Sequence, residues 1–296
     1  MFSVWTLALF ALAYTCLLFA IAWYGDRRSA RSQQALNNPW LYSLTLAVYC
    51  TSWTFFGAVG QAANNGWEFL PIYLGPMLIF IFATPMLFKI LAIGKQQGIT
   101  SIADFIASRY GKSQPLAILI TLVAIAGTIP YITLQLRAVT MAFDTLSNDL
   151  HSAWLVDSAL AVALLMALFA VLFGTRHIDA SEHQNGLMLA IGFESLVKLF
   201  AFVLVGVFVV WQVFGGIDSM LAKVTTEKVL QQRFSTDFFD QGFFTQTLLA
   251  MAAIICLPRQ FHTTVVENRR SGDLHKARWL FPGYLLLFTL FVVPIA

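Results

Sequence analysis

The sequence contains few charged residues and little cysteine. Only 11% of its 296 residues are Asp, Glu, Lys or Arg, whereas 58% are hydrophobic. A water-soluble domain needs a polar surface, so this composition excludes an ordinary soluble protein. The cysteines Cys16, Cys50 and Cys256 lie in apolar segments without C-x-x-C or histidine pairing, which supports neither a disulfide nor a zinc site. The basic residues form no stripe, so the net charge of +3 does not indicate a nucleic-acid partner.

Long apolar runs dominate the chain instead. Runs of about 20 apolar residues without alternation of period two predict helices that span a lipid bilayer. We therefore expect an all-α membrane protein with eight spans, at residues 2–24, 40–63, 69–92, 115–143, 153–174, 182–211, 242–263 and 279–296. The first run lacks the basic start and the small-residue cleavage site of a signal peptide, so we interpret it as a retained helix.

The basic residues predict the orientation of these spans. Most of the 18 lysines and arginines lie in alternate gaps between the runs. The first gap carries Arg27, Arg28 and Arg31, whereas the residues before the first run carry no basic side chain. Because basic loops stay in the cytoplasm, the N-terminus is expected outside the cell.

Two of the runs are interrupted. The second contains Tyr49-Cys-Thr-Ser-Trp-Thr-Phe-Phe-Gly57-Ala-Val-Gly60, and the seventh contains Pro258 followed by Arg259. Paired interruptions are typical of transporters built from inverted repeats, where unwound turns expose backbone groups to an ion and a solute. The alternative is that the glycines allow close helix packing and the proline only kinks its helix.

Three charges lie inside the expected spans, where each needs a partner or water. Glu194 and Lys198 are spaced i,i+4, so they can neutralise one another on one face of a helix. Arg137 has no acid nearby in the sequence. It either reaches the outer interface or a partner on another helix, or marks a permeation path.

Several motifs resemble those of a known family. The segment Gly98–Gly111 is expected to form a short interfacial helix, and its T-x-x-x-D-F-x-x-x-R-Y-G pattern resembles a signature of the sodium/solute symporters. Further similarities lie at Tyr131–Ala138, at Gly174–Asn185 and at Pro258 with Lys276–Arg278, so they run along most of the chain. The resemblance implies a LeuT-like fold, a five-plus-five inverted repeat preceded by one helix, which is incomplete in these 296 residues.

A closer resemblance is to the symporter-type sensor histidine kinases. It is carried by Asn38–Gly57, by Phe69–Pro76 and by Leu257–His262 with Val265–Asn268. It implies that residues 1–296 form a symporter-like transmembrane domain in the bacterial cell membrane, truncated at its C-terminus because the last apolar run stops at Ala296 without a polar flank. Cytoplasmic kinase domains, absent here, and a response regulator would then be partners. The alternatives are a free-standing sodium-coupled symporter and a structural scaffold, and the scaffold would require both interrupted runs to be continuous helices.

The same resemblance implies a binding site, without any catalytic residue. A sodium ion, the sole cofactor expected, would be bound by the backbone carbonyls of Ala47 and Cys50. Tyr49 stands where many family transporters carry an acid. An amino acid or small organic acid would lie in a cavity lined by residues that match the family's positions, namely Trp53, Phe56, Gly57, Gln135 and Pro258.

Overall fold

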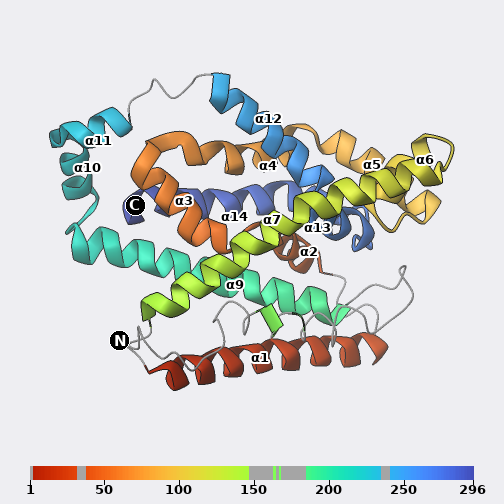
Figure 1. Ribbon diagram of the computed structural model, residues 1–296, viewed down its shortest axis with the longest axis horizontal. Helices are drawn as coiled ribbons and strands as arrows, with labels where there is room; N and C mark the ends of the chain where they lie inside the picture. Colours follow the sequence, from red (N-terminus) through yellow and green to blue (C-terminus); the bar gives the residue numbers. More distant parts are fainter. Residues whose placement is uncertain (1–2, 32–37, 147–162, 165–166, 168–184, 235–240) are drawn as a thin grey trace. The chain divides into compact units, whose positions relative to one another are not determined.

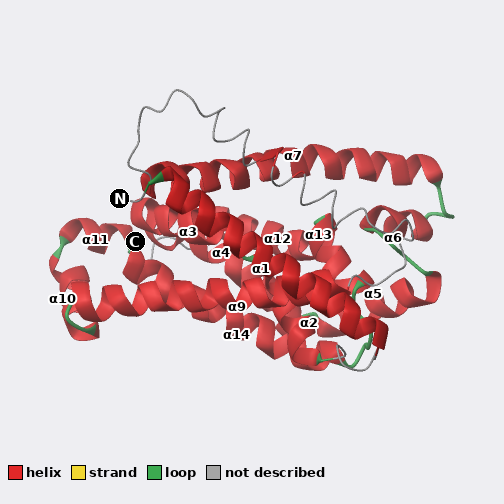
Figure 2. Cartoon of the chain, turned by 90° about the horizontal axis from the view of Figure 1, so that it is seen from below, coloured by secondary structure: helices red, strands yellow, loops and turns green. Residues whose placement is uncertain are grey.

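The computed structural model describes residues 3–31, 38–146, 163–164, 167, 185–234 and 241–296. Within these ranges every regular element is helical, as the sequence predicts (Figures 1 and 2). The chain divides into two compact units. The first comprises Met1–Leu36 with Ala103–Ala190, and the second comprises Asn37–Ile102 with Ile191–Ala296. Each unit is described by itself.

The first unit contains α1 (Val4–Arg31), most of α6 (Ile102–Arg109), α7 (Gln114–Leu146) and the beginning of α9 (Asn185–Phe208). The start of α9 packs on α1, since the backbone N–H of Gly186 donates to Asp26 Oδ1 at 2.8 Å. The short helix expected within Gly98–Gly111 is confirmed as α6. Gly98 and Gly111 flank it with φ values of +62° and +68°.

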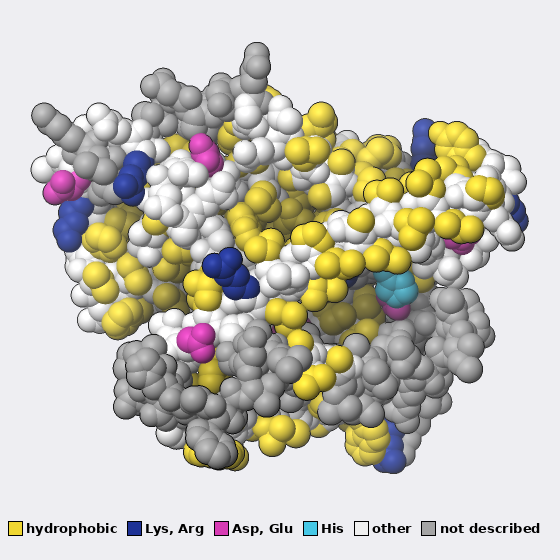
Figure 3. Space-filling model, viewed as in Figure 1, with side chains coloured by type: hydrophobic (Ala, Val, Ile, Leu, Met, Phe, Trp, Pro, Cys, Tyr) yellow, Lys and Arg dark blue, Asp and Glu magenta, His cyan; other side chains and the backbone are white. Residues whose placement is uncertain are grey.

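The surface of α7 is largely apolar. None of its residues is buried, although its side chains are mostly hydrophobic. Figure 3 shows that hydrophobic side chains cover much of the described surface on the face in view, with charged side chains confined to a few places. Such a surface is suited to lipid or to other apolar helices and is unsuited to water.

The second unit is built around α14 (Asp273–Ile295). This helix packs against α2 (Pro39–Leu46), α3 (Ser52–Asn65), α4 (Leu70–Phe82) and α5 (Thr84–Gln97), and Figure 1 shows it between these segments. Its buried face includes Phe281, Leu285, Phe288 and Val292. The ring of Phe288 stacks on Phe202 of α9 with centroids 4.9 Å apart. The core of this unit is therefore largely aromatic and aliphatic.

The chain turns sharply between α3 and α4 at the 3-10 turn η3 (Gly66–Phe69), as Figure 1 shows. Gly66 has φ +63° and ψ −119°, a conformation that disfavours a side chain. A Cβ there would also collide with the carbonyl of Arg233, at the end of α11 (Lys228–Arg233). The indole of Trp67 donates to the carbonyl of Phe234 at 3.1 Å, so the end of α11 is held against this turn.

The remaining elements of the second unit follow α9. They are the π-helical turn η5 (Val209–Val213), α10 (Ile217–Thr226), α11, α12 (Gln241–Cys256), α13 (Pro258–Phe261) and the π-helical turn η7 (His262–Val266). Helices α12 and α4 pack closely, because Gly75 of α4 lies directly against the backbone of Ala250 and Met251. A Cβ on Gly75 would come within 2.6 Å of the Ala250 side chain.

Within the described residues, five helical runs are long and apolar enough to cross a membrane, or six if the bent pair α12–α13 counts as one. The five are Trp5–Arg28, Ser52–Phe82, Gln114–Leu146, Gly186–Val213 and Asp273–Ile295. The run Ser52–Phe82 joins parts of two expected spans across the turn at Gly66. The expected span 153–174 falls mostly outside the described residues, so the total of eight and the orientation stay predictions.

Candidate functional site

The first predicted interruption is confirmed at Cys50 and Thr51. Helix α2 tightens into the 3-10 turn η2 (Ala47–Tyr49), and the backbone is then extended at Cys50 (φ −76°, ψ 114°) and Thr51 (φ −120°, ψ −169°). The helix resumes as α3. Two peptide groups therefore leave the regular helical hydrogen-bond pattern in the interior of the unit, where Cys50 is only 1% exposed.

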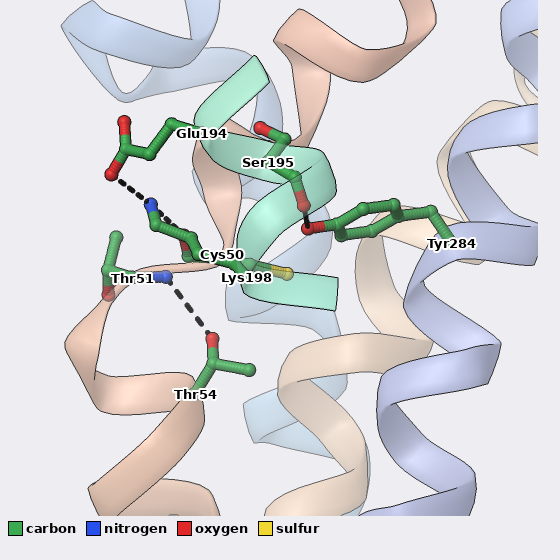
Figure 4. Close-up of polar contacts among 7 residues, drawn as sticks. All are labelled: Cys50, Thr51, Thr54, Glu194, Ser195, Lys198 and Tyr284. Atoms are coloured by element: carbon green, nitrogen blue, oxygen red, sulfur yellow. Dashed lines mark hydrogen bonds and ion pairs between the residues drawn. The ribbon is translucent and has the colours of Figure 1, made fainter. Parts of the chain in front are cut away.

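The local sequence explains where this helix stops and restarts. Asn38 caps the start of α2, accepting a hydrogen bond from the Trp40 N–H at 3.0 Å. Threonine favours the position before a helix, and Thr51 occupies that position for α3. The Thr51 N–H donates to Thr54 Oγ1 at 3.2 Å, which satisfies a donor that the break would otherwise leave without a partner (Figure 4).

An ion pair from α9 lies against this break (Figure 4). The Lys198 ammonium is 2.8 Å from Glu194 Oε1 and donates to the Cys50 carbonyl oxygen at 3.2 Å. The next residue, Ser195, uses its backbone carbonyl to accept a buried hydrogen bond of 2.8 Å from the Tyr284 hydroxyl of α14. These contacts hold this part of α9 between the broken helix and the central helix of the unit.

The second predicted interruption is confirmed at Leu257. The residue before a proline is disfavoured in the helical conformation, and Leu257 is extended with φ −63° and ψ 129°. Pro258 then begins α13, where its missing N–H costs nothing. The helix axis bends by 55° between Gly242–Cys256 and Pro258–Val266.

Buried polar side chains follow this second break. Gln260 is 0% exposed, and neither its Oε1 nor its Nε2 has a hydrogen-bond partner within the described part of the chain. The Thr264 carbonyl accepts a hydrogen bond of 2.8 Å from the Tyr42 hydroxyl of α2, which links the two broken helices directly. His262 Nε2 lies 3.2 Å from Glu267 Oε1. Polar groups thus collect where α13 passes into η7.

The segment after η7 is tied to α5 by Lys95. Its ammonium donates to Asn268 Oδ1 at 2.9 Å, to the Arg269 carbonyl at 3.0 Å and to Ser271 Oγ at 3.3 Å. Partial burial lowers the pKa of Lys95, because removal from water disfavours its charged form, while the nearby carboxylate of Asp273 acts in the opposite direction.

The expected cavity residues fall into both units. Trp53, Phe56 and Gly57 lie on α3, and Pro258 begins α13, all in the second unit. The Trp53 indole lies over Gly57, where a Cβ would come within 2.4 Å of the ring.

Gln135 and Arg137 lie on α7 in the first unit. Gln135 is half-buried and Arg137 is exposed. These two residues thus belong to a different unit from the α3 residues. Their role stays a prediction.

The backbone carbonyls of the two expected ion ligands, Ala47 and Cys50, accept hydrogen bonds from different donors. The Ala47 carbonyl accepts the Cys50 N–H at 2.9 Å, as in a tight helical turn. The Cys50 carbonyl accepts the Lys198 ammonium. Both residues are buried, at 0% and 1% exposure.

Two features of this region were not predicted from the sequence. The spacing of Lys198 and Glu194 indicated a local pair and gave no sign that the ammonium also reaches the first break. Gln260 was not singled out either, although the polar pair Arg259-Gln260 follows Pro258 inside an apolar run. That polar pair was the available signal for the buried amide.

Comparison with known proteins supports a transporter-like protein. No family model matches the chain, and no solved structure matches it. The chain is 26% identical over 250 residues to an uncharacterized symporter, YhjB, of Bacillus subtilis strain 168. The aligned region covers 82% of this chain and 47% of that protein, so the chain spans about half the length of this relative. With its apolar helices, the chain is a multi-pass membrane protein distantly similar to a symporter.

Proposed function

We propose that this chain forms a solute-binding membrane module, in which two broken helices bind and transport an amino acid or small organic acid. The observation that carries the proposal is that both breaks belong to one unit and that the two broken helices are linked by the Tyr42 hydroxyl and the Thr264 carbonyl, 2.8 Å apart. Broken helices are typical of membrane transporters, in which the backbone groups at a break bind a polar solute or ion at depth in the membrane. The buried amide of Gln260, without a partner among the described residues, offers further donors and acceptors.

The fold we propose for this module is LeuT-like, in a bacterial inner membrane, with the N-terminus outside. In the full protein we propose that the module regulates a cytoplasmic histidine kinase and its response regulator, on the sequence resemblance described above. A solute would act by its different affinity for outward-open and inward-open states. The second candidate is a free-standing symporter, which the similarity to the Bacillus subtilis protein favours.

The test is uptake and binding by the full-length protein in proteoliposomes, with a panel of radiolabelled amino acids and small organic acids. At least one solute is expected to accumulate, and Trp53→Ala is expected to reduce its uptake about tenfold, by removing an aromatic wall. Ile118→Ala, at an exposed position of α7, is the control and should leave uptake unchanged. Absence of uptake and binding across the panel, or equal uptake by Trp53→Ala, would contradict the proposal.

A further inference from the structure

The first break contains a positive charge supplied by the protein itself. The Lys198 ammonium donates to the carbonyl oxygen of Cys50, at the point where helical winding stops. Carbonyls at the end of a helix carry partial negative charge and lack intrahelical donors, so they favour a cation. Lys198 meets this demand from a neighbouring helix.

This arrangement does not fit a sodium ion at the same carbonyls. An ion bound to the Cys50 oxygen would lie beside the Lys198 ammonium, and two positive charges at such short distance repel one another. The neighbouring Ala47 carbonyl already accepts the Cys50 N–H at 2.9 Å. The adjacent side chain is the Tyr49 phenol, whose hydroxyl donates to the Ile72 carbonyl at 2.7 Å and adds no negative charge.

The charge of Lys198 is balanced locally. Glu194 lies 2.8 Å from the ammonium, one helical turn earlier on α9. The pair is therefore neutral as a whole, which permits it inside an apolar segment. Removing only the ammonium would leave a carboxylate and a backbone carbonyl facing one another, a set of oxygen atoms of the kind that hard cations prefer.

We propose that the Lys198 ammonium is a built-in replacement for sodium at the first break, so that this module adopts its solute-binding state without sodium. The inference deepens the proposed function and rests on it for the solute site. Its structural part, the exclusion of sodium by Lys198, concerns the protein alone and can be measured without any solute.

The experiment is thermal unfolding of the full-length protein in lipid nanodiscs, in sodium chloride and in N-methyl-D-glucamine chloride at equal ionic strength. The melting temperature of the wild type is expected to be the same in both salts. Lys198→Ala is expected to melt lower, and sodium should then raise its melting temperature by about 3 °C through binding to the vacated oxygen atoms. Lys198→Arg should resemble the wild type, and Lys89→Ala, at an exposed position of α5, is the matched control.

A sodium-specific rise in the wild type overturns the inference, and so does a Lys198→Ala protein that does not respond to sodium. If Lys198→Ala does not fold, Lys198→Gln is measured in its place, with the same two results decisive. Failure of the uptake panel while these sodium results hold would contradict the proposed function alone. A solute taken up only with sodium would contradict this inference and leave the proposed function standing.

Discussion

The two broken helices differ in how they satisfy the polar groups that a break exposes. At the first break, Thr54 accepts a hydrogen bond from the Thr51 N–H, and Lys198 donates to the Cys50 carbonyl. At the second break, proline removes a donor, and the Gln260 amide is buried without a described partner.

The difference indicates separate roles for the two breaks. The bonds at the first break hold it in one conformation, because movement there would cost hydrogen bonds and separate charges. A buried amide without partners is unfavourable until a group arrives that can bond to it. We therefore expect the first break to form the fixed part of the binding site and the second to change its hydrogen bonding when a solute arrives.

The ion pair at the first break gives the largest expected effect. Lys198→Met should lower the free energy of unfolding by about 2 kcal/mol, because Glu194 is left without its counter-charge; the partial exposure of the pair reduces the loss below that of a fully buried pair. The Glu194→Met/Lys198→Met double variant should lose less than the sum of the two single variants. Denaturant unfolding in nanodiscs measures all three, and strictly additive losses would show that the pair contributes nothing jointly.

A substitution in α3, the helix that restarts after the first break, is also expected to lower the free energy of unfolding. Gly57→Ala should lower stability by about 1 to 2 kcal/mol, since its Cβ would come within 2.4 Å of the Trp53 indole. Gly60→Ala is the matched control on the same helix, because its Cβ would meet nothing within 4 Å and alanine favours a helix. Thermal unfolding compares the two variants, and equal shifts would show that the close approach of Trp53 to Gly57 does not require a glycine.

The second break gives the smallest effect, with the opposite sign. Gln260→Leu should raise the free energy of unfolding by about 1 kcal/mol in the absence of solute, because it removes a buried amide that lacks described partners. The solute identified by the uptake panel should stabilise the wild type against unfolding, and it should not stabilise Gln260→Leu. Gln97→Leu, at the exposed end of α5, is the control. If Gln260→Leu is less stable than the wild type, the Gln260 amide stabilises the protein without solute, and the proposed difference between the two breaks is wrong.

Much of the helical architecture was predictable from local rules. Apolar runs predicted spanning helices, and Pro258 predicted the interruption that the structure has at Leu257, because the restriction acts between adjacent residues. The pairing of Glu194 with Lys198 followed from their spacing on one helix. Each of these features depends on residues close together in the sequence.

The contacts between distant segments were not predictable in this way. The bond from Lys198 to Cys50 joins residues 148 positions apart, and that from Tyr42 to Thr264 joins residues 222 positions apart. Both use a backbone carbonyl as acceptor, so no side chain in the sequence marks the accepting position.

The attachment of Lys95 has a mechanical consequence. Its three acceptors all follow the second break, between Asn268 and Ser271, while the lysine itself belongs to α5. If α13 and η7 tilt, α5 must either move with them or give up these bonds. Lys95 therefore ties the inclination of the proline-bent segment to the position of α5 for as long as these bonds are kept.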